Sequence, residues 1–241
     1  MLASFAGARP AQPWATLQRW RDLVFLHWRV EAGALAPLLG GLAPERIDGS
    51  AWVSAVCMRT PWIVTPGGLP LSAGEYAQVN LRTYVRHAGR PAVSFLHVCC
   101  GSRMVAAMVR RLGRLPYHAA QVTARREGLA HSYRCRGPGI LAVEFRPRLG
   151  GDRREPAALE ESLLERYASV SAAGGRVRVG ELAHAPWELC EADVAVRTNT
   201  LLGALGMDVV DPLRPELVAF APAATAVTWA PTEEARSAGS R

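Results

Sequence analysis

Tyr76-Ala-Gln-Val-Asn-Leu-Arg-Thr-Tyr-Val-Arg86 is a stretch in which apolar and polar side chains alternate. In an extended strand, successive side chains point to opposite faces, so this stretch has one apolar face and one face of hydrogen-bonding groups. The apolar face carries Val79, Leu81, Thr83 and Val85, and the polar face carries Gln78, Asn80, Arg82, Tyr84 and Arg86. The alternation and the strong β-formers predict a strand and argue against a helix.

The function depends on which face of this strand points inward. A half-buried strand with its polar face in water is one interpretation. The other is a strand of a closed barrel that holds a ligand, with the polar groups inside and the apolar face packed against helices. In that arrangement Asn80, Arg82 and Tyr84 form part of a small-molecule site. The alternation is compatible with both interpretations.

Five further motifs accompany the central strand in a recognisable order. They are Trp20-Arg-Asp-Leu-Val-Phe-Leu-His-Trp28, Asp48-Gly-Ser-Ala-Trp-Val53, Leu115-Pro-Tyr-His118, Glu165-Arg-Tyr167 and His184-Ala-Pro-Trp187. The ordered set resembles the YqjF-like family (the DUF2071 domain), which is associated with the acetoacetate decarboxylase-like superfamily. The resemblance implies an α+β fold: a mainly antiparallel sheet closed into a barrel or cone, with a few packing helices. The family often has Glu where this chain has Gln78, so an acid/base role at that position is not transferred.

Length and composition indicate one compact domain. The chain has 241 residues, 49% of them hydrophobic, and no Pro/Gly/Ser-rich or charged linker divides it. We predict a single domain over residues 14–230, with flexible termini at residues 1–13 and 231–241. No run of about 18 apolar residues indicates a membrane-spanning helix. Residues 1–13 lack the apolar core of a secretion signal, so we expect a cytoplasmic protein with no membrane partner.

The positive charge is spread along the chain. The net charge is +7, and all 28 basic residues are arginines scattered over the whole length. They form no tract with interleaved aromatics, and no helix-turn-helix or zinc-finger spacing occurs, so we expect no nucleic-acid partner. Five cysteines without framework spacing are expected to be small buried hydrophobic residues.

Two absences from the sequence limit its chemistry. No glycine-rich phosphate loop, nucleophile elbow or HExxH element is present, so we expect no cofactor and no metal. The sequence also contains no lysine. Acetoacetate decarboxylases form a Schiff base through a lysine amine. This chain has no side chain for that step, so the resemblance in fold does not carry the decarboxylase mechanism with it.

The remaining segments predict an alternation of short strands and helices. Strands are expected over residues 23–30, 51–59, 91–100, 119–126, 130–136, 140–147, 176–183 and 217–229, and helices over residues 31–39, 103–114, 156–167 and 200–205. Trp14, Leu17 and Trp20 have helix-like spacing, which predicts a helix over residues 13–21. Residues 61–74 are rich in proline and glycine and are expected to form a loop, either a cap over a pocket or an irregular crossing.

Eight side chains are candidate site residues. Catalytic roles are assigned to Arg82, Tyr84, Tyr117 and His118, and substrate-binding roles to Gln78, Asn80, His97 and His184. Arg82 would hold an anionic or enolate oxygen, while a tyrosine or histidine would transfer a proton. Arg166, within a family motif, is expected to form a structural ion pair instead.

Three functions stay open on the sequence alone. The first is a lysine-independent lyase, dehydratase or cyclase that acts on a carbonyl or carboxylate substrate. The second is a binding module with the same pocket but no turnover. The third is a structural protein whose inner polar face is a satisfied hydrogen-bond network. A homo-oligomer is compatible with all three.

Overall fold

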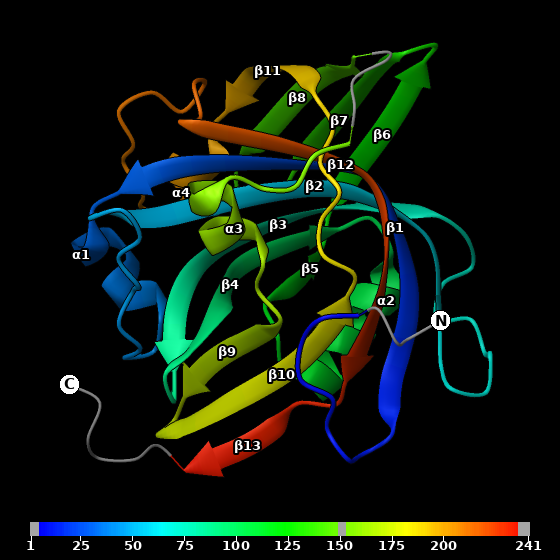
Figure 1. Cartoon of the computed structure of the whole chain (residues 1–241), viewed down its shortest axis with the longest axis vertical. Helices are drawn as coiled ribbons and strands as arrows, with labels where there is room; N and C mark the ends of the chain where they lie inside the picture. The colour runs from blue at the N-terminus through cyan, green and yellow to red at the C-terminus, as the bar shows by residue number, and fades with distance from the viewer. Residues whose placement is uncertain (1–4, 149–152, 236–241) are drawn as a thin grey trace.

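The computed structural model describes residues 5–148 and 153–235, and Figure 1 shows its elements. The strands are β1 (Trp14–Val30), β2 (Ala51–Val64), β3 (Tyr76–His87), β4 (Arg90–Cys100), β5 (Tyr117–Ala119), β6 (Gln121–Glu127), β7 (Ala130–Arg136), β8 (Ile140–Pro147), β9 (Ala168–Ala173), β10 (Arg176–His184), β11 (Ala192–Asn199), β12 (Leu217–Trp229) and β13 (Thr232–Ala235). The helices are α1 (Ala32–Leu35), α2 (Arg103–Met108), α3 (Ala158–Leu164) and α4 (Leu201–Ala204), with a 3-10 turn η1 (Ala36–Leu38) and a π-helical turn η2 (Val109–Gly113). The predicted predominance of antiparallel strands with a few helices is confirmed.

The larger sheet has nine strands, and part of it pairs in a closed circuit. The strand order is β12-β1-β2-β3-β4-β9-β10-β13, and β10 also pairs with β12. β5 joins the sheet beside β4. Among the described residues, β4 and β9 share a single pairing position, Val93 with Ser169. Every other neighbouring pair in the circuit is a ladder of several residues, so this position is the thinnest part of the circuit.

A four-stranded sheet, in the order β11-β8-β7-β6, covers the apolar face of β3. Val79 and Leu81 of β3 belong to one buried core with Tyr133, Val143 and Phe145 of this second sheet. In Figure 1 the second sheet lies at the upper end, away from β9, β10 and β13. The expectation that helices cover this face is therefore incomplete, because α1 and α4 share that place with a sheet.

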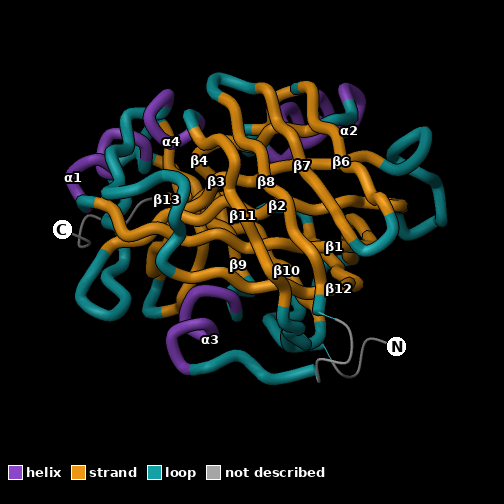
Figure 2. Tube along the Cα trace, turned by 90° about the horizontal axis from the view of Figure 1, so that it is seen from above, coloured by secondary structure: helices purple, strands orange, loops and turns teal. Residues whose placement is uncertain are grey.

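Helices lie on two opposite sides of the circuit. Figure 2 shows α2 and α3 on opposite sides of the strands. Leu163 and Leu164 of α3 are fully buried against the large sheet. Val105 of α2 packs against Ile63 and Tyr76 at the ends of β2 and β3. The two helices therefore limit the space that the strands enclose.

The structure differs from the prediction at both ends of the chain. Residues 13–21 were expected to be helical, but β1 begins at Trp14 and pairs with both β2 and β12. The backbone hydrogen bonds to strands on both sides stabilise the extended conformation more than the helix-like spacing of the apolar residues favours a helix. Residues 231–241 were expected to be flexible, but Thr232–Ala235 pair with β10. At the other end Ala6 forms a bridge with His184, while residues 1–4 and 236–241 lie outside the described part.

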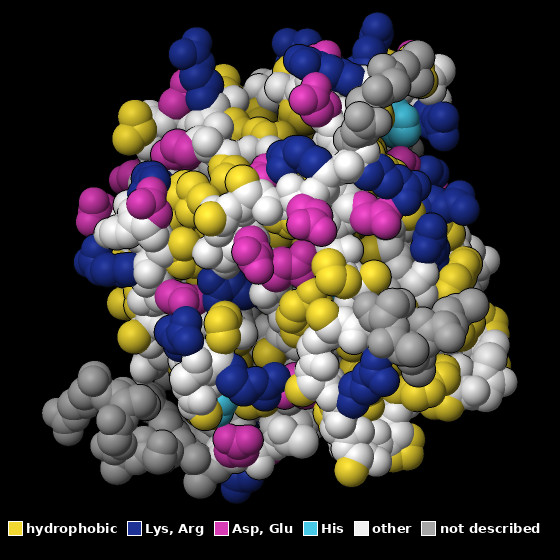
Figure 3. All heavy atoms as spheres, viewed as in Figure 1, with side chains coloured by type: hydrophobic (Ala, Val, Ile, Leu, Met, Phe, Trp, Pro, Cys, Tyr) yellow, Lys and Arg dark blue, Asp and Glu magenta, His cyan; other side chains and the backbone are white. Residues whose placement is uncertain are grey.

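The surface agrees with the scattered arginines of the sequence. Basic and acidic side chains are interspersed on the face shown in Figure 3. All five cysteines are free, and Cys57, Cys99, Cys100 and Cys135 are buried. Within the described ranges, no helix has the length and apolar character needed to span a bilayer.

Candidate functional site

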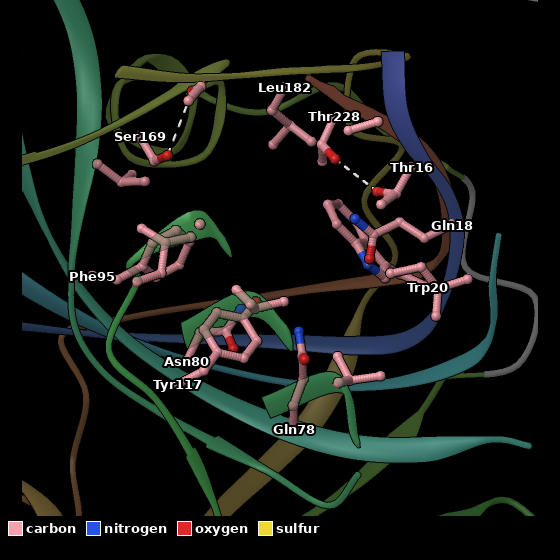
Figure 4. A pocket seen from close by; sticks show the side chains of 18 of the residues that line it. Thr16, Gln18, Trp20, Gln78, Asn80, Phe95, Tyr117, Ser169, Leu182 and Thr228 are labelled. Carbon is pink, nitrogen blue, oxygen red and sulfur yellow. Dashed lines mark hydrogen bonds between the residues drawn. The ribbon is translucent and has the colours of Figure 1, made fainter. Parts of the chain in front are cut away.

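The strand circuit surrounds a cavity of about 510 Å³, part of which is shown in Figure 4. Small-molecule sites have volumes of about 300–1,000 Å³, so the cavity has the size of such a site. Its lining comes from β1, β2, β3, β4, β5, β9, β10 and β12 together with α2, η2 and α3. Thr65 and Leu71 of the loop after β2 also line it, so that loop contributes to the wall.

The polar face of β3 points into this cavity. Gln78, Asn80 and Arg82 all line it, at every second position of the strand. The pairing register places Arg82 opposite Ser54 on β2 and opposite Phe95 on β4. Of the two orientations left open by the alternation, the structure therefore has the one with the polar groups inside.

Several polar atoms on the β3 wall are buried without a partner. They are Arg82 Nε and Nη2, Asn80 Oδ1 and Gln78 Oε1, none of which has a hydrogen-bond partner among the described residues. Burial lowers the pKa of Arg82, and the neighbouring Tyr84 hydroxyl opposes that shift. A guanidinium stays protonated under all ordinary conditions, so Arg82 brings a positive charge to the cavity.

Two other charged side chains line the cavity, and both are neutralised. Arg166 donates to Glu45 at 2.6 Å, with side-chain exposures of only 3% and 11%, which confirms the expected structural ion pair. Glu181 accepts two hydrogen bonds of 2.8 Å from Arg90. Within the described lining, Arg82 is thus the charged group without a countercharge.

His184 on β10 lines the cavity and is almost fully buried. Its Nδ1–H donates to the Ala185 carbonyl at 2.7 Å, because a carbonyl only accepts. The other ring nitrogen, Nε2, then carries the lone pair. Burial lowers the pKa of His184 to about 4, the Ala185 carbonyl opposes the shift, and the charge of Arg82 adds to it. His184 is therefore neutral at physiological pH and offers an acceptor.

Tyr117 on β5 also lines the cavity, near Asn80 in Figure 4. β5 runs parallel to β4 and places Tyr117 beside Val98. Burial raises the pKa of the Tyr117 phenol above its ordinary value. The hydroxyl stays protonated and can donate a hydrogen bond into the cavity.

His118 and His97 lie away from the cavity, on the other side of the strands. Adjacent residues of a strand point to opposite faces, so β5 can turn only one of Tyr117 and His118 inward. His118 is exposed and stacks on His97, with ring centroids 4.3 Å apart. In β4 a bulge lets Arg82 pair with Phe95 while Leu81 pairs with His97. Phe95 therefore faces the cavity and His97 faces outward.

Tyr84 shares a face with Arg82 but lies deeper than the cavity lining. It is fully buried, and its hydroxyl lies 3.0 Å from His27 Nδ1. Its ring packs in a cluster with Ile47, Trp52 and Leu163. Burial raises the pKa of Tyr84, while Arg82 favours the ionised form. Tyr84 is therefore a buried neighbour of Arg82 and does not line the cavity.

Residues not predicted from the sequence line the opposite wall. They come mainly from β1, β9, β10 and β12 and include Thr16, Gln18, Trp20, Ser169, Leu182 and Thr228. The Thr16 and Thr228 hydroxyls lie 2.6 Å apart. Figure 4 marks the hydrogen bond between them with a dashed line. Trp20 Nε1 donates to Gln18 Oε1 at 3.0 Å. Thr16, Gln18 and Trp20 are two residues apart, a strand signal hidden by the helix-like spacing of the apolar residues.

The polar groups of the lining offer both hydrogen-bond donors and an acceptor. In the part of the chain that the structure describes, no three His, Cys, Asp or Glu side chains are grouped so that they could hold a metal ion. Arg82 can hold an anion, the Tyr117 hydroxyl can donate to a carbonyl, and His184 Nε2 can accept a proton.

Comparison with known proteins places the chain in a family. The family model of DUF2071, described as an uncharacterized conserved protein, matches residues 17–225. The uncharacterized protein YqjF of Bacillus subtilis (strain 168) is 28% identical over 212 residues, which cover 83% of this chain and 86% of YqjF.

Two solved structures have a similar fold at low sequence identity. The enduracididine biosynthesis enzyme MppR with HEPES buffer bound superposes with a TM-score of 0.63 at 13% identity, covering 93% of this chain and 90% of MppR. Acetoacetate decarboxylase from Legionella pneumophila superposes with a TM-score of 0.62 at 13% identity, covering 95% of this chain and 93% of that enzyme. The chain belongs to the DUF2071 family, and it has the acetoacetate decarboxylase-like fold.

Proposed function

We propose that this protein binds a small carboxylate at Arg82 and catalyses proton transfer on a carbonyl substrate without a Schiff base. In this proposal the strand circuit acts as a barrel whose interior is the binding site. The observation that carries it is the Arg82 guanidinium, which lines the cavity and has two buried nitrogens, Nε and Nη2, without a hydrogen-bond partner among the described residues. Leaving a buried charge unpaired is costly, so a complementary anion is the simplest reason to keep it.

The neighbouring groups suit enolisation of the bound substrate. Tyr117 donates a hydrogen bond to the carbonyl oxygen, and Arg82 stabilises the negative charge that develops. His184 Nε2 takes the proton from the adjacent carbon and returns it. Because the charge of Arg82 contributes to the low pKa of His184, a carboxylate bound at Arg82 raises that pKa and makes the imidazole a better base.

Dehydration, isomerisation and cyclisation all pass through such an enolate, so the proposal gives a reaction class and not a single substrate. A lysine-dependent decarboxylation is outside it, because the sequence contains no lysine. Binding by itself is the first step that can be tested.

The test compares wild type with Arg82→Met in a thermal-shift screen of carboxylates. We expect ligand-dependent stabilisation of wild type that is absent from a folded Arg82→Met variant. Arg134→Met, which removes an exposed arginine of β7, is the matched control and should keep the shift. Equal stabilisation of Arg82→Met would overturn the assignment of Arg82.

A second measurement separates catalysis from binding. Carbonyl-containing carboxylates that bind are incubated in D2O, and deuterium at the carbon next to the carbonyl is followed by NMR. Protein-dependent exchange that falls in Tyr117→Phe supports the catalytic part of the proposal. If every such ligand binds but none exchanges, the catalytic part of the proposal is wrong and the protein is a binding module.

A further inference from the structure

The proposed function leaves the ligand undefined, and this inference rests on that function. We infer that the cavity takes an amphipathic hydroxy-monocarboxylate. Its carboxylate lies at Arg82, a hydroxyl lies at Asn80, and an apolar chain extends toward α2 and η2. Three separate features of the lining lead to these three parts of the ligand.

The charge of the lining selects one anionic group. Arg166 is neutralised by Glu45 and Glu181 by Arg90, so the described lining has a net charge of one positive unit at Arg82. A second carboxylate on the ligand would be buried without a partner, which disfavours it. The ligand is therefore a monoanion.

Asn80 selects a hydroxyl. It lies two residues from Arg82 on the same face of β3, and two residues of a strand span roughly 7 Å. Asn80 lines the cavity, and its Oδ1 is buried without a partner in the described structure. An unpartnered carboxamide oxygen requires a donor, and a hydroxyl can donate to it while also accepting from the amide nitrogen. The hydroxyl thus lies roughly 7 Å from the carboxylate.

The part of the wall that α2 and η2 contribute is apolar. Val105 and Met108 of α2 and Val109 and Leu112 of η2 line the wall, and Leu112 is 75% exposed. The lining therefore reaches from Arg82, between Phe25 and Phe95, to a partly open apolar edge. A ligand that fills this space carries its polar head inward and its hydrocarbon chain outward.

Four probes test the three parts separately by isothermal titration calorimetry. They are propanoate, octanoate, 6-hydroxyoctanoate and octanedioate. Octanoate should bind at least about tenfold more tightly than propanoate, because burying extra methylene groups is favourable. The hydroxyl of 6-hydroxyoctanoate should add about a further tenfold through Asn80. Octanedioate should bind about tenfold more weakly than octanoate.

Asn80→Leu provides the decisive variant, because leucine has a similar size and no polar group. In this variant octanoate and 6-hydroxyoctanoate should bind with equal affinity. Arg134→Met, the exposed control of β7 outside the cavity lining, should keep the tenfold preference for the hydroxylated probe. If Asn80→Leu does not fold, as judged by its thermal melt, Asn80→Ala replaces it.

The outcomes distinguish this inference from the proposed function. If no probe binds, both fail. If propanoate binds as tightly as octanoate, the amphipathic ligand is wrong but the anion site at Arg82 stands. If octanoate and 6-hydroxyoctanoate bind wild type equally, or if Asn80→Leu keeps a preference, the assignment of Asn80 is overturned.

Discussion

The two walls of the cavity differ in whether their polar side chains have hydrogen-bond partners. On the wall of β1, β10 and β12, the polar side chains are paired with one another or with backbone: Thr16 with Thr228 at 2.6 Å, and His184 with Ala185 at 2.7 Å. On the β3 wall, Arg82 and Asn80 have buried atoms without a partner among the described residues. A paired group stabilises the fold, whereas an unpaired buried group weakens it. The contrast indicates that β3 is the wall shaped for a ligand.

The same contrast appears in the two arginines that line the cavity. Arg166 has Glu45 at 2.6 Å and also donates from Nε to the Ser162 carbonyl at 2.7 Å. Arg82 has no carboxylate within ion-pair distance in the described parts of the chain. One arginine is therefore part of the structure, and the other is available to an incoming anion.

The largest expected effect separates these two arginines by stability. Arg166→Met leaves Glu45 with only the half-exposed Arg86 as a partner and removes the hydrogen bond to the Ser162 carbonyl, so it should lower the free energy of unfolding by about 3 kcal/mol. Arg82→Met removes an unpaired charge and should lower it by no more than about 1 kcal/mol. Urea unfolding of both variants measures the difference. If Arg82→Met is as destabilised as Arg166→Met, Arg82 is a structural residue and the contrast between the arginines disappears.

The next effect comes from His184 and depends on pH. Its pKa is about 4 in the folded protein, below that of an unfolded histidine, so the unfolded chain binds more protons between these values. Stability should therefore be flat above about pH 6.5 and fall toward pH 4, with a contribution from His184 of about 3 kcal/mol.

The measurement is the free energy of unfolding as a function of pH in wild type and His184→Phe. The variant should show a shallower fall, although buried His27, whose pKa burial also lowers, keeps part of the slope. If the slope in His184→Phe equals that of wild type, burial does not lower the pKa of His184 in the folded protein.

The smallest effect is expected on the paired wall. Replacing both hydroxyls in a Thr16→Val, Thr228→Val double variant removes donor and acceptor together, so stability should change by no more than about 1 kcal/mol. Carboxylate affinity should stay within about twofold of wild type, because these hydroxyls already have partners. Calorimetry with the same carboxylate that reports on Arg82 provides the measurement. A tenfold loss would mean that the Thr16 and Thr228 hydroxyls also bind the ligand.

The sequence predicts much of the fold because its local signals are strong. The alternation over residues 76–86 predicts β3 and the residues of its two faces, although not which face lines the cavity. The turns after β3, β6 and β7 predict the antiparallel neighbours. The strands β9 and β11 were missed. In β9 the side chains are small, and such a segment carries little periodicity.

The site was predicted in part, for reasons that individual residues make clear. Gln78, Asn80, Arg82, Tyr117 and His184 line the cavity as expected from their positions. His97 does not, because a bulge in β4 shifts the alternation, and a bulge cannot be recognised from residue types alone. His118 does not, because it neighbours Tyr117, which period-two alternation alone could have shown.

The single pairing position between β4 and β9 has a mechanical consequence. Elsewhere in the circuit, parting two strands breaks a row of backbone pairings, but between the described residues of β4 and β9 it breaks only the pairing of Val93 with Ser169. Segments with few backbone bonds open locally at low free energy. We therefore expect the circuit to open locally between β4 and β9. The amides of these two strands near Val93 and Ser169 should exchange with solvent deuterium before those of β1, β2 and β3. Ser169 also lines the cavity, so each opening between β4 and β9 exposes the binding space from the side.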